Sequence, residues 1–135
     1  MKNWEHLEKD IANLFHGKRQ PGSGCSPLTY KKGDVKSDKY LIECKFTEKD
    51  YYTLHVDTWE KIVGEAVSAN RIPLFCCRGK EGTFLVGSTL DVDFEEDVPM
   101  YLRAVKSKKI TIPMQFVLVN SHGISFPLVC KKIEL

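Results

Sequence analysis

Apolar residues recur at helical spacing in two stretches of the first half of the chain. Residues 3–15, NWEHLEKDIANLF, place apolar side chains every three or four positions, and residues 57–70 repeat this spacing. Such periodicity predicts two amphipathic helices. We expect Asn3 to cap the first helix and Gly17 to end it, and the second helix to open with a capping box at Asp57.

Strand-like stretches lie between and after these helices. Residues 28–35 and 40–47 flank a polar turn at 37–39, which predicts a β-hairpin. Residues 72–77 and 83–88 either form a second hairpin, or the first of them follows the helix as a parallel strand. The order helix, strands, helix, strands predicts an α/β (α+β) domain with a central mixed sheet flanked by helices.

The remaining pattern is less regular. Residues 51–56 either extend the sheet or cross over it. Residues 100–109 favour a short helix, and residues 110–130 favour two strands around the turn NSHG. Residues 18–27 are rich in Gly, Ser and Pro and are predicted to form a loop.

Length and composition narrow the class of protein. The 135 residues predict one domain, 1–135, and no apolar run approaches the ~20 residues of a membrane span. The first residues lack the apolar core of a signal peptide, so we expect a cytoplasmic protein without a membrane partner. Five cysteines without zinc-ligand spacing favour reduced thiols.

The net charge of +2 does not by itself indicate a nucleic-acid partner. Basic residues nevertheless gather in the first fifty positions, where they would form either a DNA-binding surface or an ordinary solvated surface. These residues are Lys18, Arg19, Lys31, Lys32, Lys36, Lys39 and Lys49.

The predicted strand at 40–47 carries two charges of opposite sign. Because side chains alternate across a strand, Glu43 and Lys45 share one face, while Cys44 belongs to the other. Glu43 and Lys45 form either a structural ion pair or part of a site that binds an ion. Asp34, on the preceding hairpin arm, favours the site, because the turn would fold it back beside Glu43.

Two carboxylates beside an ammonium group suit a particular chemistry. Carboxylate oxygens are the ligands that Mg²⁺ prefers, and Mg²⁺ keeps waters that can attack a phosphodiester. A neighbouring lysine can orient that water and offset the charge that develops on the phosphate. The pattern therefore predicts metal-assisted phosphodiester hydrolysis.

On its hairpin between two helices, the spacing Asp-x8-Glu-x-Lys resembles the PD-(D/E)xK nuclease superfamily. Residues 4–78 are more closely similar to archaeal-type Holliday junction resolvases and their phage relatives. The resemblance implies a restriction-endonuclease-like fold and a further acidic site residue in EKDIANLF, which is Glu8. It also implies a serine from the PGSG loop near the scissile phosphate, Ser23, with Ser26 as the alternative. One departure is Gly33, where the superfamily usually has proline.

The resulting hypothesis is a Mg²⁺-dependent endonuclease, with Mn²⁺ able to substitute, that resolves four-way DNA junctions as a homodimer. Asp34, Glu43 and the Cys44 carbonyl would hold the metal, Glu8 would be an outer or second-metal ligand, and Lys45 would position the water. The expected DNA contacts are Lys18, Arg19, Lys31, Lys32 and Lys49. The phage likeness also suggests a mobile-element protein acting in a host cytoplasm.

Two alternatives to the resolvase hypothesis stay open at this point. The chain could be another nuclease of the same superfamily, with a restriction, repair or nicking role. It could also be a branched-DNA-binding subunit that keeps the fold but does not cut.

Overall fold

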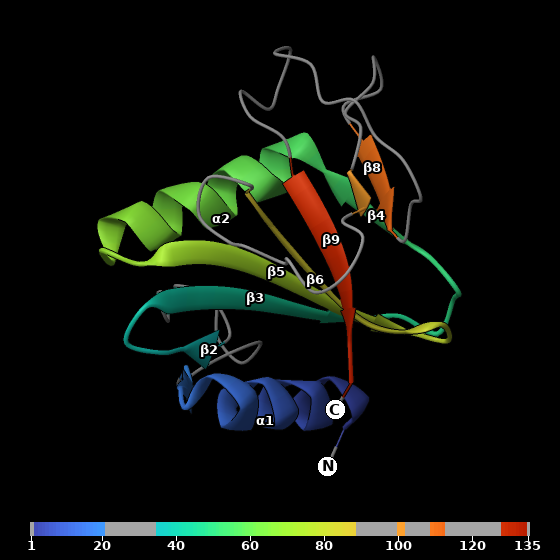
Figure 1. The fold of residues 1–135 in the computed structure, drawn as a ribbon, viewed down its shortest axis with the longest axis horizontal. Coiled ribbons are helices and arrows are strands. Elements are labelled where there is room, and N and C mark those ends of the chain that lie inside the picture. Colours follow the sequence, from blue (N-terminus) through green and yellow to red (C-terminus); the bar gives the residue numbers. More distant parts are fainter. Residues whose placement is uncertain (1, 21–34, 89–99, 102–108, 113–127, 135) are drawn as a thin grey trace.

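The computed structural model describes residues 2–20, 35–88, 100–101, 109–112 and 128–134. It is a mixed β-sheet with one helix packed on each face (Figure 1). This arrangement confirms the predicted α+β class with a central mixed sheet flanked by helices. In chain order the elements are α1 (Asn3–Phe15), β1 (Lys18–Arg19), β2 (Val35–Lys36), β3 (Tyr40–Phe46), β4 (Tyr52–His55), α2 (Val56–Ser68), β5 (Ile72–Gly79), β6 (Gly82–Ser88), β7 (Met100–Tyr101), β8 (Lys109–Ile112) and β9 (Leu128–Ile133).

The first helix spans the predicted residues, but its capping residues differ from those predicted. Lys2 is the N-cap residue, and its side chain makes no capping hydrogen bond, so the prediction that Asn3 caps the helix is wrong. The helix ends at Phe15, and its C-cap residue is His16, not Gly17, in the left-handed conformation with φ 54°. Gly17 is needed one residue later for a different reason: a Cβ there would lie 2.7 Å from the carbonyl oxygen of Lys36.

The second helix begins earlier than the sequence suggests. Its N-cap is His55, which makes no side-chain capping hydrogen bond, and Asp57 lies inside the first turn. The predicted capping box is therefore wrong. The reason is that β4 runs directly into α2 without a connecting loop, so the strand and not a polar cap sets the first helical residue.

The central sheet has the strand order β1-β2-β3-β5-β6-β9-β7. Strands β3 and β5 are parallel and joined through α2, while all other neighbours in this sheet are antiparallel. Both alternatives predicted for residues 72–77 and 83–88 are therefore realised, because β5 is parallel to β3 and also forms a hairpin with β6. The first predicted hairpin is present in β2 and β3, and its residues 28–34 lie outside the described part.

The second half of the chain departs more from expectation. Strand β4 does not extend the central sheet but pairs with β8 in a separate two-stranded sheet. Together with α2 it forms the connection that crosses from β3 to the parallel strand β5, which is the second of the two predicted alternatives. Met100 and Tyr101 form strand β7 and Lys109 begins β8, so the helix predicted over 100–109 is wrong at those positions. Strands β8 and β9 match the two strands expected near 110–130, yet they belong to different sheets. The NSHG turn lies outside the described residues.

Two hydrophobic clusters fill the layers on either side of the sheet. The cluster under α2 includes Trp59, Ile62 and Phe75, and the cluster under α1 includes Leu7 and Ile11. Each helix spans 13 residues, about 20 Å at 1.5 Å per residue. Within the described segments, no helix has the length and apolar character to cross a membrane.

Two cysteine thiols in the α2 layer are expected to make stability fall in alkaline solution. Burial, with neighbouring thiols adding, raises the pKa of Cys77 and of Cys130 from 9.0 to about 12. Above pH 9 these thiols would ionise in the unfolded chain but not in the folded one. The folded state then holds more protons, so the free energy of unfolding falls toward pH 12, by at most about 1.4 kcal/mol per pH unit for each thiol.

Urea unfolding under reducing conditions between pH 8 and pH 10.5 measures this slope. A variant that combines Cys77→Ala and Cys130→Ala should lose the part of the slope that the two thiols cause, whatever its absolute stability. An equal slope in both proteins would contradict the assignment.

Candidate active site

The pairing of β3 with β5 shows toward which face of the sheet each charged side chain points. On β3, Glu43 pairs with Phe75 and Lys45 pairs with Cys77 of the parallel neighbour β5. Both partners belong to the cluster under α2, so Glu43 and Lys45 point toward α2. Cys44 belongs to the cluster under α1 and points the other way.

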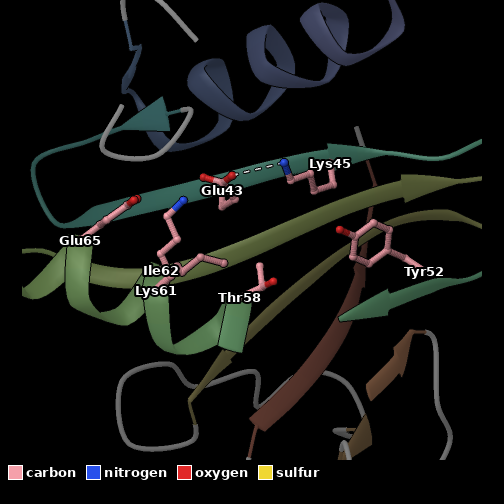
Figure 2. Close-up of a pocket in the computed structure, with 7 residues that line it drawn as sticks. All are labelled: Glu43, Lys45, Tyr52, Thr58, Lys61, Ile62 and Glu65. Carbon is pink, nitrogen blue, oxygen red and sulfur yellow. Dashed lines mark ion pairs between the residues drawn. The ribbon is translucent and has the colours of Figure 1, made fainter. Parts of the chain in front are cut away.

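Glu43 and Lys45 open into a cavity of about 310 Å³ between β3, β4 and α2 (Figure 2). Lys45 Nζ lies 3.5 Å from Glu43 Oε1, and the two side chains are 40% and 15% exposed. An ion pair this exposed to solvent contributes little to stability, so its geometry is more informative than its energy. It leaves a carboxylate and an ammonium group side by side at the wall of a solvent-accessible cavity.

Five further residues line the same cavity, and none of them was a predicted site residue. Thr58, Lys61 and Glu65 project from one side of α2, at intervals of three and four residues. Figure 2 shows Lys61 and Glu65 reaching from α2 toward Glu43. The sequence shows that these residues share one side of a helix with the buried Ile62. It does not show that this side of the helix would face Glu43 and Lys45 on β3.

Tyr52 completes the cavity from β4, and its hydroxyl points inward (Figure 2). Burial raises the pKa of Tyr52, with Cys77 and the negative charge of Glu43 raising it further. The phenol therefore stays protonated at neutral pH and can donate a hydrogen bond to an anionic group in the cavity.

Glu8 lies on α1, in the layer on the opposite side of the sheet from Glu43, and it is only 2% exposed. Arg19 Nε donates a hydrogen bond to Glu8 Oε1 at 2.9 Å. Arg19 pairs with Val35, which also belongs to the α1 layer. The contact occupies one hydrogen-bond donor of Arg19, a residue predicted to bind DNA. The predicted role of Glu8 as a metal ligand remains a prediction.

The other predicted site residues divide between the described and undescribed parts of the chain. Lys18 on β1 is exposed, as is Lys49, whose Nζ lies 5.5 Å from the ring centroid of Tyr51. In the part of the chain that the structure describes, no three His, Cys, Asp or Glu residues are grouped to hold a metal. Outside that part lie Ser23, Ser26, Lys31, Lys32 and Asp34.

The sequence matches no protein-family model and no curated protein. The structure is similar to that of Hjc from Archaeoglobus fulgidus, a Holliday junction resolvase from an archaeal hyperthermophile, with a TM-score of 0.51. The match covers 79% of this chain and 84% of that chain at 17% sequence identity. At this identity the likeness establishes a resolvase-like fold.

Proposed function

We propose that this protein is a metal-dependent endonuclease that cuts branched DNA, resolving four-way junctions by paired phosphodiester hydrolysis. One observation carries the proposal: Glu43 and Lys45 lie side by side in an open polar cavity, on a sheet whose fold is similar to that of a resolvase. The fold similarity suggests the kind of substrate, and the carboxylate–lysine pair suggests the reaction.

We place the proposed divalent cation at Glu43, because carboxylate oxygens are the ligands that Mg²⁺ prefers. Glu43 presents a carboxylate with partial access to solvent, and Val35, which directly follows Asp34 in the sequence, pairs with Ile42, which directly precedes Glu43. We assign Glu43, Asp34 and the Cys44 carbonyl as ligands of Mg²⁺ or Mn²⁺. Glu8, which is buried in the opposite layer and bonded to Arg19, is not assigned to this ion. The bound ion would supply Lewis acidity toward the phosphate and its attacking water.

The chain's own groups would act on the phosphodiester in complementary ways. The Lys45 ammonium would orient the attacking water, whose oxygen forms the new bond to phosphorus as the bond to the 3′ oxygen breaks. The 3′ oxygen takes up a proton, which leaves a 5′-phosphate and a 3′-hydroxyl. Lys61 and the Tyr52 phenol, on the far walls of the cavity, would offset negative charge on the phosphate oxygens.

The proposed partner is a four-way DNA junction bound by a homodimer. Two sites related by a two-fold axis would allow paired nicks, and recognition would depend on branch shape more than on base sequence. Lys18, Lys31, Lys32 and Lys49 would contact backbone phosphates, together with the remaining donors of Arg19. Ser23 would approach the scissile phosphate.

The direct test is cleavage of a synthetic immobile junction, a matched linear duplex and a single strand. With Mg²⁺ or Mn²⁺ we expect symmetric paired nicks in the junction, and with EDTA we expect none, because hydrolysis needs the cation. End-labelled strands resolved on denaturing gels report both the position and the chemistry of the cut. Readdition of Mg²⁺ to the EDTA-treated protein should restore cutting, which separates metal removal from unfolding.

The other outcomes point to specific alternatives. Equal cutting of duplex and junction would replace the resolvase by a general or sequence-directed nuclease with the same site. Tight junction binding without cleavage under any metal would leave a non-cleaving branched-DNA-binding subunit.

A further inference from the structure

Two lysines face each other directly at one edge of the central sheet. Lys18 on β1 pairs with Lys36 on β2, and Lys36 pairs in turn with Leu41 on β3. Directly opposed residues of antiparallel strands project to the same face of the sheet. Leu41 is two residues from Glu43 on β3, so both lysines share the face on which Glu43 lies.

The positive charges of Lys18 and Lys36 repel each other across the strand pair. Direct cross-strand pairing of two ammonium groups destabilises a sheet, and a strand pair of two residues each has few other contacts to offset this cost. The arrangement is favourable when an anion lies between the two groups. The pair therefore has the character of a binding feature and not of a stabilising one.

The lysine pair also lines a cavity of about 280 Å³, which we call the edge cavity. Its lining residues are His16, Gly17, Lys18, Gln20, Lys36, Ser37, Asp38 and Arg71. Three of these carry a permanent positive charge, and Asp38 is the one carboxylate among the described lining residues. The edge cavity is therefore electropositive and polar.

Backbone contacts hold the wall of the edge cavity in place. Arg71 Nε donates to the Ser37 carbonyl at 2.8 Å, and its Nη1 donates to the carbonyls of Ala69 and Asn70 at 2.9 and 3.2 Å. These bonds fix the guanidinium against the β2–β3 turn, so its charge is oriented before any ligand arrives. A pre-oriented cation binds an anion with less loss of conformational entropy.

We infer that Lys18 and Lys36 form a binding site for a backbone phosphate of the DNA strand whose scissile phosphate lies at Glu43. Leu41, the register partner of Lys36, lies about 7 Å from Glu43 along β3, and Lys36 and Lys18 lie one and two strand spacings of ~4.8 Å to its side. A phosphate recurs every ~3.4 Å of helix axis on each strand, so the site would hold a phosphate within a few nucleotides of the cut.

The position of α2 favours an extended chain as the ligand over a small anion. This helix packs mainly on β5, and to a lesser extent on β4 and β3, so it leaves β1 and β2 at the sheet edge, as Figure 1 illustrates for β2. A strand of DNA could pass over β2 and reach the cavity of Glu43 on the same face. The inference rests on the proposed function in taking DNA as the ligand and Glu43 as the position of the scissile phosphate.

The test measures DNA binding with cleavage switched off. A variant combining Lys18→Gln and Lys36→Gln is compared with the wild-type protein in EDTA, on a fluorescent junction, between 50 and 300 mM salt. We expect about tenfold weaker binding at low salt and a slope of log affinity against log salt smaller by about one. The control combines Lys9→Gln and Lys80→Gln, which removes the same charge from exposed positions on α1 and in the β5–β6 turn.

A thermal unfolding measurement distinguishes binding from structural support. Because the opposed charges repel, the Lys18/Lys36 variant should unfold at the same or a higher temperature than the wild-type protein. Weaker binding with retained stability supports the site. Affinity equal to that of the control variant, or lower thermal stability with unchanged binding, overturns it.

The nuclease proposal and the phosphate site can be tested separately. If the wild-type protein does not cut DNA but the Lys18/Lys36 variant still loses affinity, the phosphate site stands and the nuclease proposal falls. If the wild-type protein cuts junctions and the variant binds them normally, the nuclease proposal stands and the phosphate site falls. A wild-type protein that binds no DNA overturns both.

Discussion

Replacement of Glu43 by glutamine is expected to slow junction cleavage by about 10²–10³-fold. Glutamine keeps the shape of the side chain but removes the charge that would hold the cation. The side chain of Glu43 is 15% exposed at the wall of an open cavity, so the neutral amide remains hydrated and the fold should persist. Single-turnover cleavage rates at saturating protein give the loss in the chemical step, and thermal unfolding checks the fold.

Glu65 provides a matched control for this substitution. It lines the same cavity from α2, and Glu65→Gln removes the same charge without touching β3. We expect this variant to cut within a few-fold of the wild-type rate. A loss as large as that of Glu43→Gln would show that the cavity needs only its overall negative charge, and an unimpaired Glu43→Gln protein would contradict the proposed site.

Lys45→Met tests the other member of the pair within the same experiment. Methionine keeps much of the length of the side chain and removes the ammonium group. We expect this variant to cleave the junction more slowly but to bind it almost normally in EDTA. The reason is that Lys45 is assigned to the attacking water and not to the DNA backbone. Equal losses of binding and cleavage would instead make Lys45 a phosphate contact.

Replacement of Phe75 by alanine is expected to give the largest loss of stability, about 3–5 kcal/mol. Phe75 is fully buried in the layer under α2, and its ring centroid lies 5.3 Å from that of Tyr52. Truncation removes buried apolar surface and leaves a void between the sheet and α2 that the neighbours can only partly fill. Urea unfolding at neutral pH measures the free-energy difference.

Val67→Ala serves as the control for the core substitution. Val67 lies on the same helix that covers Phe75, but it is 68% exposed, so we expect a change within about 0.5 kcal/mol. Because Phe75 pairs with Glu43 across β3 and β5, its loss should also impair cleavage at temperatures where the variant remains folded. A Phe75→Ala protein as stable as Val67→Ala would contradict the assignment of Phe75 to the core.

The two helices were predictable because amphipathic periodicity is a local property of the chain. Residues 3–15 and 57–70 repeat apolar positions at helical spacing whatever lies around them, and both helices form there. Their ends were not predictable in the same way. Asp57 has the residue type of a cap, but the direct passage of β4 into α2 sets the start of that helix, and this depends on where β4 pairs.

The alternation of side chains along β3 likewise predicted that Glu43 and Lys45 share one face. In the structure this face lies toward α2. The sequence alone could not indicate that Lys61 and Glu65 would meet that face. Long-range pairing also separates β8 from β9, although the two are successive strands in the sequence order of the elements. Such contacts depend on the whole arrangement of the sheet and leave no periodic signal.

Side-chain periodicity over a few residues is enough to predict the two helices, the main strands and the carboxylate–lysine pair on one strand face. Two other features became visible only in the folded chain: Glu8 lies in the layer opposite Glu43, and Lys18 lies opposite Lys36. The layer of Glu8 depends on the sheet face on which α1 packs, and the pairing of the lysines depends on which distant backbones exchange hydrogen bonds. A shift of one residue in the strand pairing would have moved Lys18 and Lys36 to the other face.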